Sequence, residues 1–202
     1  DNFEAHYNLA NTIRDLNNIE EKEFVKLKKK ELNKLDEVIE IYKKAIELKP
    51  DYIEAYNNLG IVQHKNGRTE DAEINFRKAI QFKPDNSEAY NNLANVLNEL
   101  NKIDEAVEYY EKAIELNPDY ADAYNNLGIL FTTINKKDEA EKNFKKSLEL
   151  NPELVEAKNN LSVLLIQKQV LLKINQVREF KDEIKVGSLD SNKGLISNPF
   201  IS

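Results

Sequence analysis

The chain has 202 residues and a formal net charge of −7, with 41% hydrophobic and 32% charged residues. It carries too much charge for a membrane protein, lacks the 18 or more uninterrupted apolar residues of a spanning helix, and would repel nucleic-acid phosphates. Cysteine and methionine are absent, which excludes disulfides and thiolate sites and, in a chain that begins at Asp1, leads us to expect a segment of a larger protein.

Residues 1–52 are predicted to form a divergent first unit of two helices. EAHYNLANTI, residues 4–13, mirrors EAYNNLGIV further along the chain, and VIEIYKKAIELKP, residues 38–50, mirrors AVEYYEKAIELNP. Leu9 and Val38 are 29 positions apart, whereas the corresponding distance in later units is 13, so 16 extra residues lie between them. Because apolar residues keep a spacing of three and four from Leu32 onward, we expect an elongated second helix that projects beyond the other units.

From residue 53 the chain repeats with a period of 34 residues, in units 53–86, 87–120 and 121–154. Prolines that end segments such as KAIELKP mark the period at Pro50, Pro84, Pro118 and Pro152. Each unit contains two apolar runs with i, i+3, i+4 spacing, which predicts two amphipathic helices. Between the runs lie residues that tolerate the left-handed conformation ending a helix, namely Gly67, Asn101 and Asn135.

Small and aromatic residues also recur at fixed positions. Small side chains allow two antiparallel helices to approach closely, and large rings fill the space between them. The small residues include Gly60, Ala94 and Gly128, and the rings include Phe76, Tyr110 and Phe144. The pattern resembles the tetratricopeptide repeat, whose motif consists of W-x2-L-G-x2-Y, A-x3-F, a second small residue and P. In the unit 121–154 the matching positions carry Tyr124, Leu127, Gly128, Phe131, Ala140, Phe144, Ser147 and Pro152, with aromatic residues in place of W and Y.

The resemblance implies an all-α fold, a right-handed solenoid of antiparallel helix pairs with a C-terminal capping helix. In such a solenoid the first helices of the units line the concave side. Gln63 departs from the family pattern, which has an apolar residue at its position. The expected function of this fold is to bind another polypeptide, and the candidate contacts are polar residues on the first helices that the core does not require.

The C-terminal region departs from the repeat. VEAKNNLSVLLIQKQ restarts a unit, but Lys158 replaces the ring, and Ile174 and Arg178 occupy the small and aromatic sites of a second helix. We interpret residues 155–185 as a degenerate repeat and capping helix that covers the last unit. The composition then turns polar, and residues 186–202 are predicted to form a flexible tail. The alternative for this tail is a short docking peptide formed by Leu195, Ile196, Pro199 and Phe200.

Asparagines form a column on the first helices. A primary amide can bond both the N–H and the C=O of an extended backbone, so a ladder of amides could hold a peptide by its main chain. The candidate peptide-binding residues are Asn58, Asn92, Asn126, Asn160, Asn57, Asn91, Asn125, Asn95, His64, Glu88 and Asp122. In this column the chain resembles the repeat domain of the O-linked N-acetylglucosamine transferases. The alternative is that these amides bond across neighbouring repeats and stabilise the stack.

The acidic residues concentrate in the middle repeat, where residues 87–120 contain two basic and eight acidic side chains. An acidic residue also recurs near the start of the first helices, as Glu88 and Asp122 show. Such a surface favours ligand segments with basic residues. Acidic residues also stabilise helix N-termini, and this is the alternative explanation. The tetratricopeptide proteins that clamp a C-terminal carboxylate do so with Lys and Arg. The corresponding positions here carry Asn57, Asn91, Glu88 and Asp122, so no carboxylate clamp is expected.

No catalytic constellation is visible, so the chain alone is not expected to be an enzyme. His6 and His64 lie in different units without a second metal ligand nearby in sequence, and no phosphate-binding glycine loop is present, so neither a metal nor another cofactor is expected. The chain also lacks a signal-peptide pattern, which favours the cytoplasm. The leading hypothesis is a scaffold that binds a protein or peptide. The alternatives are the substrate-recruiting region of a larger transferase and a self-associating assembly module.

Overall fold

The computed structural model describes residues 3–17 and 24–193, and side chains within residues 3–12 and 34–179. This described part of the chain consists of helices joined by turns, which confirms the all-α expectation. The helices are α1 (Phe3–Asn17), α2 (Phe24–Leu48), α3 (Ile53–Lys65), α4 (Thr69–Phe82), α5 (Ser87–Glu99), α6 (Ile103–Leu116), α7 (Ala121–Thr133), α8 (Lys137–Leu150) and α9 (Val155–Lys193). None of the described helices is both long and apolar enough to cross a membrane.

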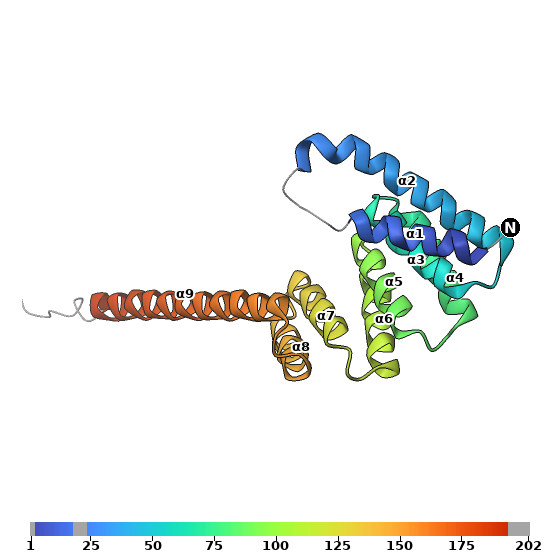
Figure 1. Cartoon of the computed structure of the whole chain (residues 1–202). Helices are drawn as coiled ribbons and strands as arrows, with labels where there is room; N and C mark the ends of the chain where they lie inside the picture. Colours follow the sequence, from blue (N-terminus) through green and yellow to red (C-terminus); the bar gives the residue numbers. More distant parts are fainter. Residues whose placement is uncertain (1–2, 18–23, 194–202) are drawn as a thin grey trace, which may run out of the picture.

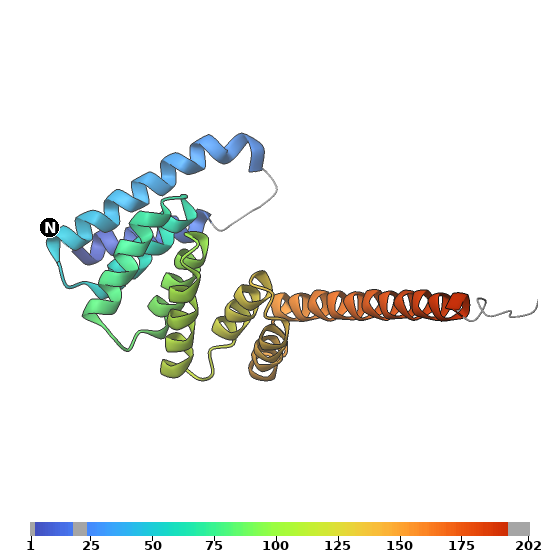
Figure 2. The same ribbon diagram turned by 180° about the vertical axis from the view of Figure 1, so that it is seen from behind.

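The helices form successive antiparallel pairs that stack in one direction (Figure 1). Each helix packs on the one before it, and first helices of adjacent repeats also touch, as α3 touches α5 and α5 touches α7. The view from behind shows the same stack, with α9 leaving its far end (Figure 2). The chain is therefore the helical-repeat solenoid that the 34-residue period predicts.

The turns inside three of the pairs have the left-handed residues that the sequence predicts. Gly67, Asn101 and Asn135 have φ values of 73°, 59° and 61°. In each turn the next residue donates its backbone N–H to the carbonyl five positions earlier at 2.8 Å, as Lys102 does to Leu97. This closure satisfies a carbonyl at the end of the first helix and turns the chain into the second helix.

The core lies between the two helices of each pair and between neighbouring pairs. Phe76, Tyr110 and Phe144 are each at most 2% exposed, and they sit against the small residues of the first helices. A Cβ added to Gly60 or Gly128 would lie 2.7 Å from the ring of Phe76 or Phe144, respectively. These two glycines are therefore required by the close approach of a ring to a helix backbone.

The helix α2 is 25 residues long, whereas α4, α6 and α8 each have 14. Its N-terminal half extends past the stacked pairs (Figure 1). The extra residues between Leu9 and Val38 therefore include a stretch of helix that the other units lack. Val38, Ile39 and Tyr42 of the C-terminal half are fully buried and hold this half of α2 in the stack.

The helix α9 differs from the expected capping helix and tail. It is one continuous helix of 39 residues, so residues 186–193 are helical where a flexible tail was expected. A physical reason lies at Gln169, which takes the place of Gly67, Asn101 and Asn135 and favours continuation of the helix. Ile174 and Arg178 therefore extend α9 and do not belong to a second helix. Residues 194–202, including the proposed docking peptide, lie outside the described residues.

Candidate peptide-binding groove

The asparagine column is a pair of columns joined by hydrogen bonds between repeats. The Nδ2 atom of the second asparagine in each repeat donates to the Oδ1 atom of the first asparagine in the preceding repeat. The distances are 3.4 Å from Asn92 to Asn57, 3.1 Å from Asn126 to Asn91, and 3.0 Å from Asn160 to Asn125. We name Asn57, Asn91 and Asn125 the inner amides, and Asn92, Asn126 and Asn160 the outer amides.

The inner amides are covered by the repeat that follows. Asn57, Asn91 and Asn125 are only 5–6% exposed, so they hold adjacent repeats together and offer little surface to a ligand. The structural alternative left open by the sequence is thus present in the fold. Residues adjacent on a helix point about 100° apart, which explains why only one asparagine of each pair can face outward.

The outer amides are half-buried, and their orientation is set by the bonds to the inner amides. Each outer amide commits one N–H to the inner column. In the described structure, no further hydrogen bond engages the second N–H or the Oδ1 atom of Asn92, Asn126 or Asn160. These atoms can therefore pair with the main chain of a ligand.

At the N-terminal end the ladder begins with a different partner. Asn58 occupies the outer position and donates to the Tyr7 hydroxyl at 2.8 Å and to Asn11 Oδ1 at 3.4 Å. Tyr7 stands where later repeats carry an inner amide. Asn58 therefore resembles the outer amides in position, and it is engaged by the first repeat.

The two acidic candidates gather around Tyr120, the residue that precedes α7. Burial raises the pKa of Tyr120 to about 12, and the nearby charges of Glu88 and Asp122 add to the effect. Asn57 also donates its Nδ2 to Glu88 Oε1 at 3.1 Å. The two carboxylates therefore lie at one edge of the amide columns and make this part of the groove negative.

Asn95 and His64 take part in bonds within the solenoid. Asn95 Oδ1 accepts a hydrogen bond from the Tyr110 hydroxyl at 2.5 Å and so ties α5 to α6. Burial raises the pKa of this hydroxyl, which stays protonated as a donor. His64 Nε2 lies 2.9 Å from Glu99 Oε2 and links α3 to α5. Both residues therefore have structural partners in the solenoid itself.

A small cavity of about 160 Å³ opens between α7 and α9, beside the last outer amide. It is lined by Ile129, Thr132, Thr133, Phe144, Asn160, Val163 and Leu164. Ile129 is 37% exposed and Val163 is 54% exposed. They stand at the positions equivalent to Asn95, one repeat and two repeats further along the chain, respectively. The available sequence signal was the replacement of the Asn95 amide by an apolar side chain at this groove position. We name this the groove cavity.

Comparison with known families identifies the repeat. Models described as "Tetratricopeptide repeat" match residues 53–86 and 85–153, and one described as "TPR repeat" matches residues 29–67. The chain is a tetratricopeptide-repeat (TPR) protein. Repeats of this family are protein-interaction modules, so the coarse functional expectation is confirmed.

Solved structures similar to this TPR protein include several other TPR proteins. A crystal structure of MamA shares 25% identity over 82% of this chain and 95% of that chain, with a TM-score of 0.63. YrrB, described as a TPR protein with an unusual peptide-binding site, shares 25% identity over 81% of this chain and 76% of its own, with a TM-score of 0.59. The first TPR of Spaghetti (RPAP3), bound to the HSP90 peptide SRMEEVD, shares 28% identity over 59% of this chain and 93% of that chain, with a TM-score of 0.55. A search of curated protein sequences finds no match.

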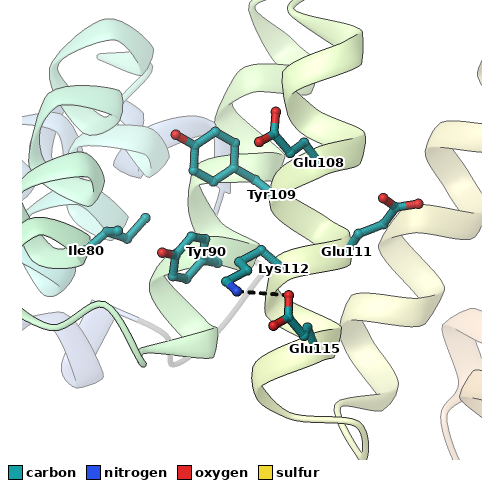
Figure 3. Close-up of a pocket in the computed structure, with 7 residues that line it drawn as sticks. All are labelled: Ile80, Tyr90, Glu108, Tyr109, Glu111, Lys112 and Glu115. Atoms are coloured by element: carbon teal, nitrogen blue, oxygen red, sulfur yellow. Dashed lines mark hydrogen bonds and ion pairs between the residues drawn. The ribbon is translucent and has the colours of Figure 1, made fainter.

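The TPR protein also has a larger cavity on its second helices, which the sequence reasoning missed. It measures about 450 Å³ and is lined by Ile80, Tyr90, Glu108, Tyr109, Glu111, Lys112 and Glu115 (Figure 3). Arg77 holds one wall, because its Nη1 donates to the Tyr109 hydroxyl at 2.8 Å. Lys112 pairs with Glu115 at 2.9 Å. Tyr109 stands where neighbouring repeats have Asn75 and Asn143, and this change of residue type was the available signal.

Metal binding has no candidate in the described part of this TPR protein. No three or more His, Cys, Asp or Glu side chains there are placed to hold an ion together. His64 is already close to Glu99, and the acidic residues that line the larger cavity, Glu108, Glu111 and Glu115, are separate carboxylates along α6. The arrangement offers hydrogen bonds, apolar contact and negative charge to a ligand, which are the means by which one polypeptide recognises another.

Proposed function

We propose that this TPR protein holds an extended polypeptide along the first helices, with the outer amides bonding its main chain. The observation that carries the proposal is the amide ladder. It repeats one half-buried amide per repeat and fixes each amide by a bond to the repeat before it. A receptor whose donors are held in place loses little freedom on binding, which favours affinity. The resemblance to the O-linked N-acetylglucosamine transferase repeats supports the same mode.

The groove cavity gives such a ligand a side-chain preference. Its volume of about 160 Å³ is well below the roughly 300–1,000 Å³ typical of small-molecule sites. It suits one aliphatic side chain, which would contact Ile129 and Val163 while the neighbouring main chain bonds to Asn160. A peptide bound here is therefore expected to place an apolar residue beside the last rung of the ladder.

Charge adds a second preference. Glu88 and Asp122 lie near Tyr120 at the edge of the amide columns, and the chain as a whole has a net charge of −7. Such a surface attracts basic segments and repels acidic ones. The HSP90 peptide bound by Spaghetti contains two glutamates and an aspartate. We expect this TPR protein to select peptides of the opposite charge.

The test compares the two amide columns, because mutation of either column breaks the same ladder bonds. The probe is a display library of random peptides, followed by fluorescence polarisation with an enriched peptide. The triple variant Asn92→Ala, Asn126→Ala and Asn160→Ala is expected to lose at least about tenfold in affinity, or about 1.4 kcal/mol. The matched control, Asn57→Ala, Asn91→Ala and Asn125→Ala, is expected to lose clearly less affinity, because it frees the outer amides from their ladder bonds but leaves them available to the ligand, and to be less stable than the wild type. Equal losses in both variants, or no enriched peptide, would contradict the proposal.

The same groove would serve equally well as the substrate-recruiting region of a larger transferase. The resemblance of the asparagine column to the O-linked N-acetylglucosamine transferase repeats is the observation that favours this second candidate. The discriminating measurement is the sequence of the parent gene on the C-terminal side of Ser202. A transferase domain there would make the bound polypeptide a substrate, whereas its absence would leave an adaptor.

A further inference from the structure

The exposed half of α9 carries a stripe of β-branched apolar side chains. Residues 169–179 are all exposed, and Figure 1 shows this part of the helix extending away from the stack. The stripe consists of Val163, Ile166, Val170, Ile174 and Val177, which are 54%, 60%, 52%, 43% and 54% exposed. At 3.6 residues per turn these five side chains lie within about 80° of one another and form a row roughly 21 Å long. We name this row the valine–isoleucine stripe.

The stripe lies on the opposite side of α9 from the residues that attach it to the solenoid. Ala157 and Leu164 are buried, and Leu161 packs against the core formed with α7 and α8. The stripe therefore has no role in attaching α9 within the described structure. An apolar row of this length on a helix without tertiary support is typical of an interaction surface.

The stripe continues the surface by which each repeat contacts the next one. Asn159 is equivalent to the inner amides Asn57, Asn91 and Asn125, and it lies on the same side of α9 as the stripe. In the inner amides this position is covered by the following first helix, whereas Asn159 is exposed. The occupant of the stripe is thus expected to be a helix, at the place where a further repeat would stack.

The spacing of the stripe identifies which helix fits. Its steps are three, four, four and three residues, and its sequence is Val, Ile, Val, Ile, Val, so both are symmetric about Val170. When two copies of α9 lie antiparallel with Val170 facing Val170, Val163 meets Val177 and Ile166 meets Ile174. A two-fold interface requires this self-complementarity, because each contact occurs twice.

Length and charge favour the same arrangement. An antiparallel pair centred on Val170 brings residues 155–185 of both copies alongside each other, about 45 Å of helix, with the valine–isoleucine stripe in the central part of the contact. It places Lys173 level with Gln167 and Arg178 level with Ser162 of the second copy. A parallel pair would instead place each of these cations level with its own equivalent, and like charges repel.

We propose that α9 pairs antiparallel with α9 of a second copy through the valine–isoleucine stripe, forming a two-fold dimer with the two solenoids at opposite ends. The inference goes beyond the proposed peptide binding and does not depend on it. Val163 also lines the groove cavity, so the decisive substitutions are placed at Val170, which does not. The interface is an open surface of the monomer, so its loss leaves the solenoid folded.

Light scattering with size-exclusion chromatography tests the dimer. The chain mass is 23.4 kDa, and the wild type is expected to have about twice this mass in the micromolar range. Val170→Glu places two carboxylates at the symmetry axis and is expected to give a monomer with unchanged helix content. The matched control is Leu172→Glu, an equally exposed apolar position on the other side of α9, which is expected to stay dimeric. A monomeric wild type, or a control that dissociates as fully as Val170→Glu, would overturn the proposal.

Cysteine crosslinking tests the orientation, since the chain has no cysteine of its own. Under mild oxidation, Val170→Cys is expected to give a covalent dimer. Val163→Cys and Val177→Cys are each expected to remain uncrosslinked alone and to crosslink when the two variants are mixed, dissociated and reassociated. Efficient crosslinking of Val163→Cys by itself would show a parallel pair and overturn the antiparallel assignment.

Discussion

Repeats 87–120 and 121–154 build the same contact between their two helices in different ways. In the first, Ala94 faces Tyr110, whose hydroxyl donates to Asn95. In the second, Gly128 lets the Phe144 ring approach the backbone, and Ile129 stands where Asn95 would be. The ring of the second helix therefore decides what the first helix presents to the groove, a hydrogen-bonded amide in one repeat and an apolar wall in the other.

The difference extends along the chain as an alternation. Repeat 1–52 has Ala10, Asn11 and Tyr42, with the Tyr42 hydroxyl bonded to Asn11, and so resembles repeat 87–120. Repeat 53–86 has Gly60, Ile61 and Phe76 and so resembles repeat 121–154. We name these the tyrosine repeats and the phenylalanine repeats. The groove consequently alternates between polar and apolar positions, which would give an extended ligand a two-repeat pattern.

The second helices alternate in the same order. Both phenylalanine repeats place a glutamate between a cation of their own repeat and a lysine from further along the chain. Glu73 pairs with Arg77 at 3.0 Å and with Lys102 at 2.8 Å, and Glu141 pairs with Lys145 and Lys168 at 2.6 Å each. The tyrosine repeats have Ile39 and Val107 at the glutamate position. The two repeat types thus differ both at the groove and on the outer surface.

The largest effect is expected from Gly128→Ala, which gives a phenylalanine repeat the small residue of a tyrosine repeat. Its Cβ would lie 2.7 Å from Phe144, and such overpacking typically destabilises by about 1–3 kcal/mol. Without a clash, the higher helix propensity of alanine would stabilise by up to about 1 kcal/mol. The sign of the change in unfolding free energy, measured with urea, is therefore decisive. A gain in stability would show that the ring has room and that the comparison is wrong.

A smaller effect is expected from Phe144→Tyr. The new hydroxyl would lie beside Ile129, which stands in the place of Asn95 and offers no acceptor, and the lack of this hydrogen bond costs about 0.5–1.5 kcal/mol. Adding Ile129→Asn and Gly128→Ala completes the tyrosine-repeat set and is expected to restore most of the loss. A mutant cycle that compares the summed losses of the three single variants with the loss of the triple variant measures this coupling. Additive losses in the triple variant would mean that the three positions do not act as a set.

The smallest effect is expected in the pH dependence of stability, because the phenylalanine repeats have a half-buried glutamate at a position that the tyrosine repeats fill with an apolar residue. Hydrogen bonds from Lys145 and Lys168 lower the pKa of Glu141 from 4.5 to about 2. A carboxyl group with a lowered pKa stabilises the fold fully above about pH 4.5 and loses this contribution as the pH falls toward 2. Glu141→Gln should therefore remove part of the stability difference between neutral and acidic pH, measured by thermal unfolding. Glu111→Gln, on a tyrosine repeat, serves as control and should leave that difference intact.

The period and the turn residues were sufficient to predict the fold. Proline spacing gave the repeat length, and Gly67, Asn101 and Asn135 marked turns that have positive φ values. The continuity of α9 was readable as well, because Gln169 replaces these turn residues. The boundary at residue 186 was missed because polar composition alone does not end a helix.

The groove was only partly predictable. Sequence spacing placed all the asparagines on the first helices, but burial of Asn57, Asn91 and Asn125 depends on the rotation between neighbouring repeats. The groove cavity depends on the volumes of Ile129, Phe144 and Val163 brought together from three helices. Neither quantity is a property of one repeat, so neither could be obtained from the spacing within a repeat.

The contacts in this solenoid join mainly neighbouring helices, and this shapes how the molecule opens. Local unfolding is expected to begin at the outermost helices, because each repeat is stabilised by its neighbours and the terminal ones have a neighbour on one side only. Backbone amides of α5 and α6 should then exchange hydrogen most slowly. A polypeptide that spans several rungs would join distant repeats directly, so its binding should slow exchange far from the residues it touches.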